Sequence, residues 1–350
     1  MVLINTIDIS PPLLNSSCAW SSDLKQLTEL YESEYTGAIT TRTATLKGFE
    51  EDEKHTVAFT TSGTTTINSY GYSPHPLSQY LTWVEEILTT HASFNKAIII
   101  SITASTAGEI AQMVDAIQEL RTKLLDNQRP SGKTRIGVEL NTSCPNISYA
   151  SPSGYSFKSL WPLVIVLGDA FAQDPTLTLG MKLPPYTHMD QYMEVMAGLR
   201  SLAVTPPGRE KTNPFAFLTC TNTLGNSLLF SEQTVPKETG DKNEGKDAEK
   251  EKDDTKAKAK TSQFAVPPVL GGLAGDGLHP LALGNVYRFR QMLSEESKET
   301  GLSDIKIIGV GGVTSKEAAE RMRKAGADVI ACATLFGKEG VRAFEILGKD

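Results

Sequence analysis

Short apolar segments alternate with longer stretches of helical periodicity along most of the chain. Residues Arg135 to Leu140 read Arg-Ile-Gly-Val-Glu-Leu, and a short run of this kind is typical of a buried strand. The pattern predicts eight strands, at residues 13–17, 37–42, 97–102, 135–141, 177–183, 215–221, 305–310 and 328–333. The intervening stretches predict helices at residues 22–32, 76–91, 106–125, 157–172, 189–202, 280–293, 316–324 and 339–347.

Eight strands with interleaved helices predict an α/β fold of the closed (β/α)₈ TIM-barrel type, because parallel strands need helical crossovers. A doubly wound open sheet is the alternative. The barrel is favoured because no Gly-x-Gly-x-x-Gly follows the first strand and polar residues end nearly every strand. We expect residues 1–350 to form a single domain.

Two segments interrupt this repeat. Residues 55–72 are rich in Thr and β-branched side chains, which predicts a hairpin excursion between the second strand and its helix. Residues 231–263 alternate Lys with Asp and Glu and carry almost no large apolar side chain. Such a segment cannot offset its ordering entropy by burial, so we expect a disordered, charged insertion within the one domain.

Charge and cysteine usage exclude several classes of protein. The net charge of −7 and a pI near 5.4 argue against a nucleic-acid partner, because no basic surplus neutralises phosphates. The four cysteines are widely spaced, unlike a disulfide framework, a zinc site or an iron–sulfur site. The first 24 residues contain no Lys or Arg, and no apolar run approaches the ~20 residues of a membrane span. We therefore expect a cytoplasmic protein with no membrane partner.

Polar side chains with useful chemistry follow the 135–140 run. The sequence there is Asn-Thr-Ser-Cys-Pro-Asn from Asn141 to Asn146, and the proline prevents the strand from continuing. Loops at the carboxyl ends of parallel strands converge above the sheet, where carboxamides can bind a polar ring and Cys144 can remove a proton. A strand end with an ordinary half-buried cysteine is the alternative interpretation.

Further strand ends carry the same kind of residue: Ser16-Ser17, Arg42-Thr43, Lys182, Asn222-Thr223, Gly311-Gly312 and Ala333-Thr334. A second glycine-rich run, 271–275, follows the sixth strand and the insertion. Glycines at such positions suit a phosphate held by backbone N–H groups, although an ordinary tight turn also explains them. Lys182 lies in an apolar stretch, which favours a buried cation over a snorkelling surface lysine.

Four segments, Asn141–Asn146, Gly180–Tyr186, Asn222–Asn226 and Ile307–Gly312, together resemble the class 1 dihydroorotate dehydrogenases. The likeness is greatest to the homodimeric, fumarate-using class 1A branch, and it runs in order from about residue 13 to about residue 346. The resemblance implies an FMN-containing (β/α)₈ barrel that oxidises dihydroorotate to orotate in pyrimidine (UMP) biosynthesis. It also implies fumarate as the electron acceptor and a homodimeric enzyme.

The resemblance assigns roles to individual residues. Cys144 matches the catalytic base that takes a proton from C5 while hydride leaves C6 for flavin N5, and Lys182 matches the lysine that stabilises negative charge on the flavin. The implied cofactor residues are Ser17, Arg42, Thr43, Asn141, Lys182, Thr221, Gly275, Gly311, Gly312, Ala333 and Thr334. The implied substrate residues are Arg42, Asn68, Tyr70, Gly71, Tyr72, Asn141, Asn146, Asn222 and Thr223.

The chain departs from the family pattern mostly on the substrate side. Arg42 stands where the pattern has Lys, Tyr70 and Tyr72 replace aliphatic residues, and Cys18 and Ala333 replace glycines. A planar guanidinium does not replace an ammonium one for one. Two alternatives therefore stay open: a paralogue that oxidises another dihydropyrimidine or cyclic imide ring, and a flavin-binding protein without activity. The intact Cys144–Lys182 pair argues against the second.

Overall fold

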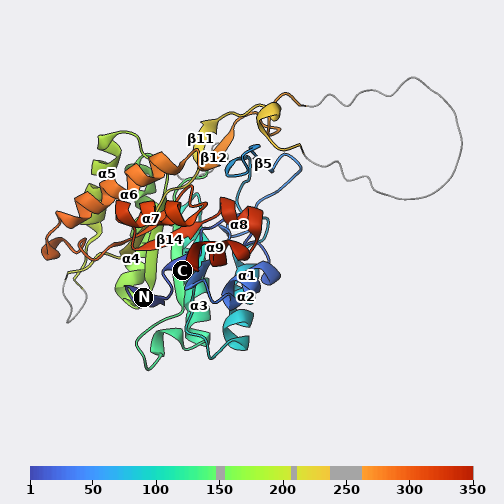
Figure 1. The fold of residues 1–350 in the computed structure, drawn as a ribbon. Helices are drawn as coiled ribbons and strands as arrows, with labels where there is room; N and C mark the ends of the chain where they lie inside the picture. Colours follow the sequence, from blue (N-terminus) through green and yellow to red (C-terminus); the bar gives the residue numbers. More distant parts are fainter. Residues whose placement is uncertain (147–153, 206–210, 237–261, 350) are drawn as a thin grey trace, which may run out of the picture.

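The computed structural model describes residues 1–146, 154–205, 211–236 and 262–349. Its centre is an eight-stranded sheet in which all neighbouring strands run parallel (Figure 1). The strands, in sheet order, are β4 (Ala38–Thr40), β7 (Ala97–Ile102), β8 (Ile136–Asn141), β9 (Thr178–Leu183), β10 (Phe215–Cys220), β13 (Lys306–Val310), β14 (Val329–Cys332) and β3 (Leu13–Asn15). These are the eight predicted strands, and the predicted (β/α)₈ barrel is confirmed.

The barrel is closed between β3 and β4 by the side chain of Asn15. Its Oδ1 accepts from the Thr40 N–H at 2.8 Å, and its Nδ2 donates to the Thr40 carbonyl at 2.6 Å. The backbone adds one bond at this seam, from the N–H of Gly37 to the carbonyl of Leu13 at 2.8 Å. Asn15 is fully buried, so a carboxamide side chain here performs the pairing that backbone groups perform elsewhere in the sheet.

Helices surround the sheet, and the major ones are α1 (Leu24–Glu32), α2 (Leu77–Thr90), α3 (Ala107–Lys123), α4 (Phe157–Gln173), α5 (Met189–Leu202), α6 (His279–Ser294) and α7 (Lys316–Ala325). These agree with prediction to within two residues at each end. The last predicted helix, 339–347, is wrong in its extent. Two short helices, α8 (Thr334–Glu339) and α9 (Arg342–Gly348), are separated at Gly340, whose φ of 60° lies outside the helical region.

Side chains along each strand point alternately toward the helices and toward the barrel interior, so the barrel has an outer core and an inner core. On β8, Ile136, Val138 and Leu140 pack outward against the helices, so Gly137, Glu139 and Asn141 face the barrel interior. The same alternation on β9 turns Lys182 inward. The sequence periodicity that makes these strands therefore also selects which polar side chains reach the barrel axis.

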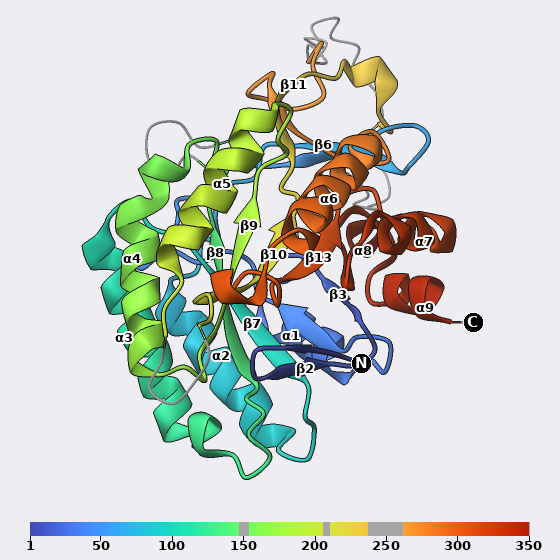
Figure 2. The ribbon, with the colours of Figure 1, turned by 90° about the vertical axis from the view of Figure 1, so that its left-hand side faces the viewer.

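An N-terminal hairpin, β1 (Val2–Ile4) paired with β2 (Ile7–Ile9), packs against the apolar half of the barrel interior. Ile4, Ile7 and Ile9 are buried with Leu14, Phe217 and other inward residues. Figure 2 shows the hairpin at the end of the barrel away from β6 and β11. This hairpin was not predicted from the sequence. It closes one end of the barrel and leaves the other end for the site.

A second sheet lies at that other end, with strand order β11 (Leu224–Ser227), β12 (Gly271–Gly275), β6 (Thr65–Asn68) and β5 (Val57–Phe59) (Figure 1). The predicted hairpin within residues 55–72 is confirmed as β5–β6. The glycine-rich run 271–275 is a strand, paired antiparallel with β6. Its glycines allow close approach of neighbouring chains: a Cβ at Gly271 would lie 2.5 Å from the Asn68 carbonyl oxygen.

Most of the predicted disordered insertion, residues 237–261, lies outside the described residues. At its two ends the prediction of disorder is wrong. The N–H of Ser231 donates to the carbonyl of Gln263 at 3.0 Å, and the rings of Phe230 and Phe264 lie 5.7 Å apart. The short helix η2 (Ser231–Gln233) follows Phe230. Aromatic residues that flank the charged run give these ends an apolar contact, whereas the sequence of the run has almost no large apolar side chain.

In the part of the chain that the structure describes, no helix combines the length and the apolar character needed to cross a membrane. Among the described residues, none of the four cysteines, Cys18, Cys144, Cys220 and Cys332, forms a disulfide bond.

Candidate active site

A cavity with about 1000 Å³ of empty volume lies between the carboxyl ends of the barrel strands and the second sheet. Every site residue predicted from the sequence lies on its wall: Ser17, Arg42, Thr43, Asn68, Tyr70, Gly71, Tyr72, Asn141, Cys144, Asn146, Lys182, Thr221, Asn222, Thr223, Gly275, Gly311, Gly312, Ala333 and Thr334. The fold thus brings the predicted residues together, while their individual roles stay predictions.

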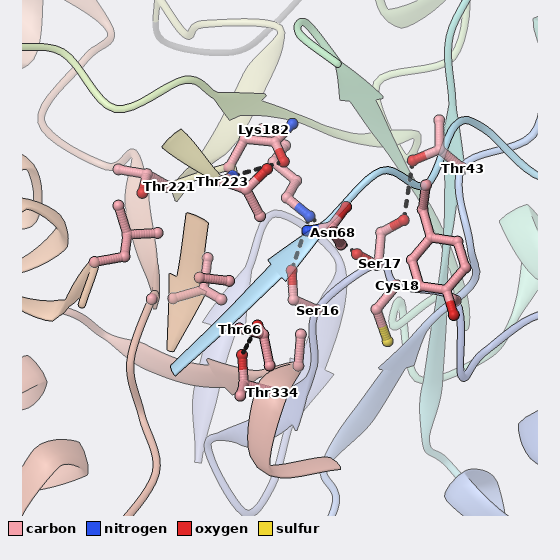
Figure 3. A pocket seen from close by; sticks show the side chains of 18 of the residues that line it. Ser16, Ser17, Cys18, Thr43, Thr66, Asn68, Lys182, Thr221, Thr223 and Thr334 are labelled. Carbon is pink, nitrogen blue, oxygen red and sulfur yellow. Dashed lines mark hydrogen bonds between the residues drawn. The ribbon is translucent and has the colours of Figure 1, made fainter. Parts of the chain in front are cut away.

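Lys182 provides a buried cation at the end of β9. Its side chain is almost inaccessible, and Nζ donates to Ser16 Oγ at 3.0 Å and to the Ser17 carbonyl at 3.1 Å (Figure 3). Burial lowers the pKa of the Lys182 ammonium below its usual range, and the nearby Glu139, Cys18 and Cys144 partly oppose this shift. The ammonium is therefore an ionisable group within the cavity and not a snorkelling surface lysine.

Glu139 lies inside the barrel, and sequence reasoning did not single it out. It accepts hydrogen bonds from Thr219 Oγ1 at 2.6 Å and Ser101 Oγ at 3.3 Å. Burial raises the pKa of the Glu139 carboxyl, while the positive charge of Lys182 and the two hydroxyls counteract this. The sequence could have indicated its inward position, because Glu139 stands two residues before Asn141 and residues at i and i+2 of a strand share a face.

Four carboxamides form two hydrogen-bonded pairs on one side of the cavity. Asn146 Nδ2 donates to Asn68 Oδ1 at 3.0 Å, and Asn222 Nδ2 donates to Asn141 Oδ1 at 3.1 Å. Asn146 also donates to the Tyr70 carbonyl at 2.8 Å, from which Cys144 Sγ lies 3.9 Å. The amides and the thiol thus line one polar surface, of the kind that binds a flat ring carrying both donors and acceptors.

Glycines with left-handed backbone conformations form another wall. Gly275 has φ +74° and Gly312 has φ +66°. A Cβ on Gly312 would lie 2.5 Å from His279 Cβ and 2.7 Å from the Gly275 carbonyl oxygen, so only glycine fits. Because no side chain covers the backbone at these glycines, an anionic group can come close enough to be bound by backbone N–H donors.

His279 supports these glycines and was also missed in the sequence. Its Nδ1 lies 2.8 Å from the Gly311 carbonyl oxygen, which makes Nδ1 the protonated nitrogen. Arg321 Nε donates to the other ring nitrogen at 3.2 Å. His279 begins α6, so this contact fixes the loop after β13 relative to the start of that helix.

Thr221 places a buried hydroxyl at the cavity. Its Oγ1 is buried and has no hydrogen-bond partner among the described residues, yet Thr221 lines the cavity. Buried hydroxyls are nearly always paired, so this one is explained by a polar ligand in the cavity. Together with the glycine wall and Lys182, it makes the cavity suitable for a cofactor that carries both a polar ring and an anionic group.

Cys18, which replaces a glycine of the family pattern, also lines the cavity. Its Sγ lies 3.9 Å from Ser21 Oγ, and burial raises the pKa of the Cys18 thiol. The thiol is therefore kept in its neutral form, and it adds apolar volume to this wall without adding charge.

Arg42 is held by an acidic partner that the sequence did not reveal. Its Nη2 lies 2.7 Å from Glu51 Oε1 and its Nη1 lies 3.2 Å from Oε2, a bidentate pair. Nη2 also donates to the Gly71 carbonyl at 3.3 Å. The guanidinium lies 5.4 Å from the centre of the Tyr70 ring, within the range of a cation–π contact.

Comparison with known proteins assigns this arrangement to a family. The family model described as dihydroorotate dehydrogenase matches residues 2–205 and 249–350. The chain belongs to the dihydroorotate dehydrogenase family. This makes it an oxidoreductase of CH–CH bonds and confirms the resemblance drawn from the strand-end motifs.

Individual members of the family align with nearly the whole chain. A Streptococcus equi subsp. equi protein, provisionally named dihydroorotate dehydrogenase A (fumarate), is 28% identical over 351 residues, covering 99% of this chain and 90% of that protein. A Lachancea kluyveri protein named dihydroorotate dehydrogenase (fumarate) is 25% identical over 341 residues, covering 97% and 88%. The chain is therefore similar to the fumarate-type, class 1A branch.

Proposed function

We propose that this protein oxidises dihydroorotate to orotate with FMN as its cofactor. The observation that carries the proposal is the placement of Cys144, the two carboxamide pairs and Lys182 on the wall of one cavity at the carboxyl ends of the strands. A ring-binding amide set, a proton acceptor and a buried cation are what dehydrogenation of a carbon–carbon bond in a polar ring requires.

The residues present suit FMN. Ser17, Thr43, Thr221, Ala333, Thr334 and the glycines Gly275, Gly311 and Gly312 would hold it. Two observations support this: the glycine wall, and the buried Thr221 hydroxyl, which has no partner within the described part of the chain. When bound, FMN supplies a hydride acceptor. Lys182 would place its ammonium against the negative charge that the cofactor gains, with Ser16 Oγ and the Ser17 carbonyl orienting that ammonium.

The protein's own part in the reaction is proton transfer and positioning. Asn68, Asn141, Asn146 and Asn222 would bind the ring amides and hold C5 within reach of Cys144. The Cys144 thiolate takes the C5 proton and becomes a thiol, while the C6 hydride leaves with its electron pair. Loss of one proton and one hydride forms the C5=C6 double bond of orotate, so charge and electrons balance.

The proposal extends to the electron acceptor and the assembly. We propose fumarate as the acceptor, because relatives that align with nearly the full chain carry fumarate in their names. We further propose a homodimer of single-domain subunits that needs no nucleic acid or membrane partner. The single domain is supported by a sheet whose strands span residues 13 to 332. A cytoplasmic location stays a prediction.

Three absorbance measurements and one sedimentation measurement on one preparation test the proposal. The purified protein should be yellow, should lose its flavin absorbance when dihydroorotate is added without oxygen, and should regain it on addition of fumarate. A colourless protein that takes up no FMN contradicts the whole proposal. Reoxidation by NAD⁺ or a quinone and not by fumarate contradicts the acceptor, and a monomer in sedimentation contradicts the dimer.

A second candidate substrate is favoured by one observation. Glu51 already binds Arg42, so a substrate carboxylate would have to bind a cation that is already paired. A dihydropyrimidine or cyclic imide without a carboxylate would not need Arg42. Faster flavin reduction by dihydrouracil than by dihydroorotate would select this candidate.

A further inference from the structure

Two side-chain cations line the cavity among the residues that the structure describes, Lys182 and Arg42. Lys182 is bound to Ser16 and Ser17 at the end of β9. Arg42 contacts the carbonyl of Gly71, and the preceding carbonyl, that of Tyr70, is bound by Asn146 and lies near Cys144 Sγ. Arg42 is thus the cation that contacts the same backbone segment, Tyr70–Gly71, as the candidate base and the candidate ring-binding amide of Asn146.

A carboxylate on a substrate ring would therefore meet Arg42. Dihydroorotate carries its carboxylate on C6, next to the C5 carbon that gives up its proton. With C5 at Cys144, the carboxylate-bearing C6 is the adjacent ring atom, and Arg42 is the cation bonded to the Gly71 carbonyl, one residue after the Tyr70 carbonyl beside Cys144. The Tyr70 ring, in cation–π contact with the guanidinium, limits the directions in which Arg42 can turn to receive it.

Glu51 already occupies the face of Arg42 that binds carboxylates best. Both of its oxygens engage the two terminal guanidinium nitrogens, and this fork-to-fork arrangement is the strongest that arginine makes with a carboxylate. The Arg42 side chain is 6% exposed and that of Glu51 is 22% exposed. Partial burial reduces screening of the pair by water, so a second carboxylate must displace Glu51 or bind beside its negative charge.

We propose that Glu51 is a specificity-determining residue, which competes with the carboxylate of the substrate for Arg42. The inference rests on the proposed function of this cavity. Glu51 lowers the affinity for ring substrates that carry a carboxylate and leaves the affinity for carboxylate-free rings unchanged. Glu51 lies in the irregular segment between β4 and β5, outside the barrel. Selectivity is therefore set by a residue that is neither one of the proposed FMN-binding residues nor the proton acceptor.

The test compares two ligands that differ only by the carboxylate, orotate and uracil, in calorimetric titrations of the purified holoenzyme. In Glu51→Gln the amide keeps the size of the side chain and loses its charge. The apparent dissociation constant for orotate should fall at least about fivefold, because Arg42 is then available for a larger fraction of the time. The constant for uracil should not change.

Glu50→Gln is the matched control, since it removes the same charge from the neighbouring exposed position. It should change neither constant. A second variant, Glu51→Asp, retains the charge on a shorter side chain and should give an orotate affinity between those of the parent and Glu51→Gln. Far-ultraviolet circular dichroism and flavin content show whether each variant is folded.

Four outcomes overturn the inference: unchanged or weaker orotate binding in Glu51→Gln, an equal gain for uracil, an equal gain in Glu50→Gln, or no orotate binding by any variant. The proposed function is tested separately by flavin reduction with dihydroorotate. Tighter orotate binding in Glu51→Gln without reduction by dihydroorotate would leave the role of Glu51 intact and refute the reaction. Reduction without a change in orotate affinity would do the reverse.

Discussion

Asn141 and Lys182 are direct partners across the parallel pair β8–β9, and both line the cavity. The register places a candidate ring-binding amide and the buried ammonium at the same height on adjacent strands. A shift of one residue in either strand would turn one of the two side chains toward the helices. Strand pairing, and not a flexible loop, therefore sets where the Asn141 amide lies relative to the Lys182 ammonium.

Replacing Cys144 with Ala should leave flavin content unchanged and slow flavin reduction by dihydroorotate by ~10²–10⁴-fold, the usual effect of removing a positioned general base. Anaerobic stopped-flow absorbance measures this rate. Reduction by dithionite serves as the control and should be equally fast in both proteins. If the variant is reduced by dihydroorotate as fast as the parent, another group accepts the proton.

The rate of flavin reduction should fall on the alkaline side at a pH below 10.5, the ordinary value for lysine. Burial lowers the pKa of Lys182, and the ammonium charge is present below that pKa and lost above it. The rate of reduction should therefore decline as Lys182 deprotonates. In Lys182→Met the residual rate should show no decline from this cause. A profile that is still rising at pH 10.5 contradicts the assignment.

Glu139→Gln should move that alkaline decline to lower pH. The negative charge of Glu139 raises the pKa of Lys182 against the effect of burial, and Gln removes the charge while retaining an acceptor for Thr219 Oγ1. At lower pH Lys182 is protonated in both proteins, so that part of the profile serves as an internal control. An unmoved decline would show that Glu139 is already protonated in the folded protein, as its raised pKa allows.

Gly312→Ala should weaken FMN binding about tenfold or more, equivalent to ~1.4 kcal/mol. The added Cβ would lie 2.5 Å from His279 Cβ, at a backbone φ that L-residues rarely adopt. Gly340→Ala is the matched control, because Gly340 also has a positive φ but no atom within 4 Å of an added Cβ. Fluorescence titration of the apoprotein with FMN measures both affinities. Equal losses in the two variants would attribute the effect to backbone strain alone.

Replacing residues 237–260 with a short Gly-Ser linker should leave flavin content and turnover nearly intact. The flanking segments are already joined by the Ser231–Gln263 backbone bond and by the Phe230–Phe264 contact, so the linker needs only to span adjacent ends. Steady-state turnover and thermal unfolding should both match those of the parent. Loss of turnover with flavin retained would show that the segment takes part in catalysis.

The barrel strands were predictable because each one is a compact, largely apolar run, and most of these runs end at polar residues. The same property predicted the cavity wall, since strand ends of a parallel barrel converge. Strand β12 was missed because Gly271 and its neighbours lack the side chains that mark a strand. It pairs with β6, about two hundred residues earlier in the chain, and β11 pairs in turn with β12.

Glu51 could not be predicted for a different physical reason. Its partner Arg42 lies nine residues away through an irregular segment, and neither helical nor strand periodicity relates the two positions. Several acidic residues stand together there, at Glu50, Glu51, Asp52 and Glu53, and the sequence does not indicate which one turns inward. Glu139 was predictable in principle, because its strand and its inward-facing partner Asn141 had both been identified.

The Asn15 seam links assembly of the barrel to assembly of the site. Ser16 and Ser17 follow Asn15 directly, and Arg42 and Thr43 follow its partner Thr40 after one residue. One carboxamide therefore sets the distance between the residues that orient Lys182 and the cation bound by Glu51. Without it, Thr40 would leave a buried donor and a buried acceptor unpaired, at about 1–3 kcal/mol each. A chain that failed to join its first and second barrel strands would not close the barrel. It would at the same time lose the alignment of the proposed FMN-binding residues with the proposed substrate-binding residues.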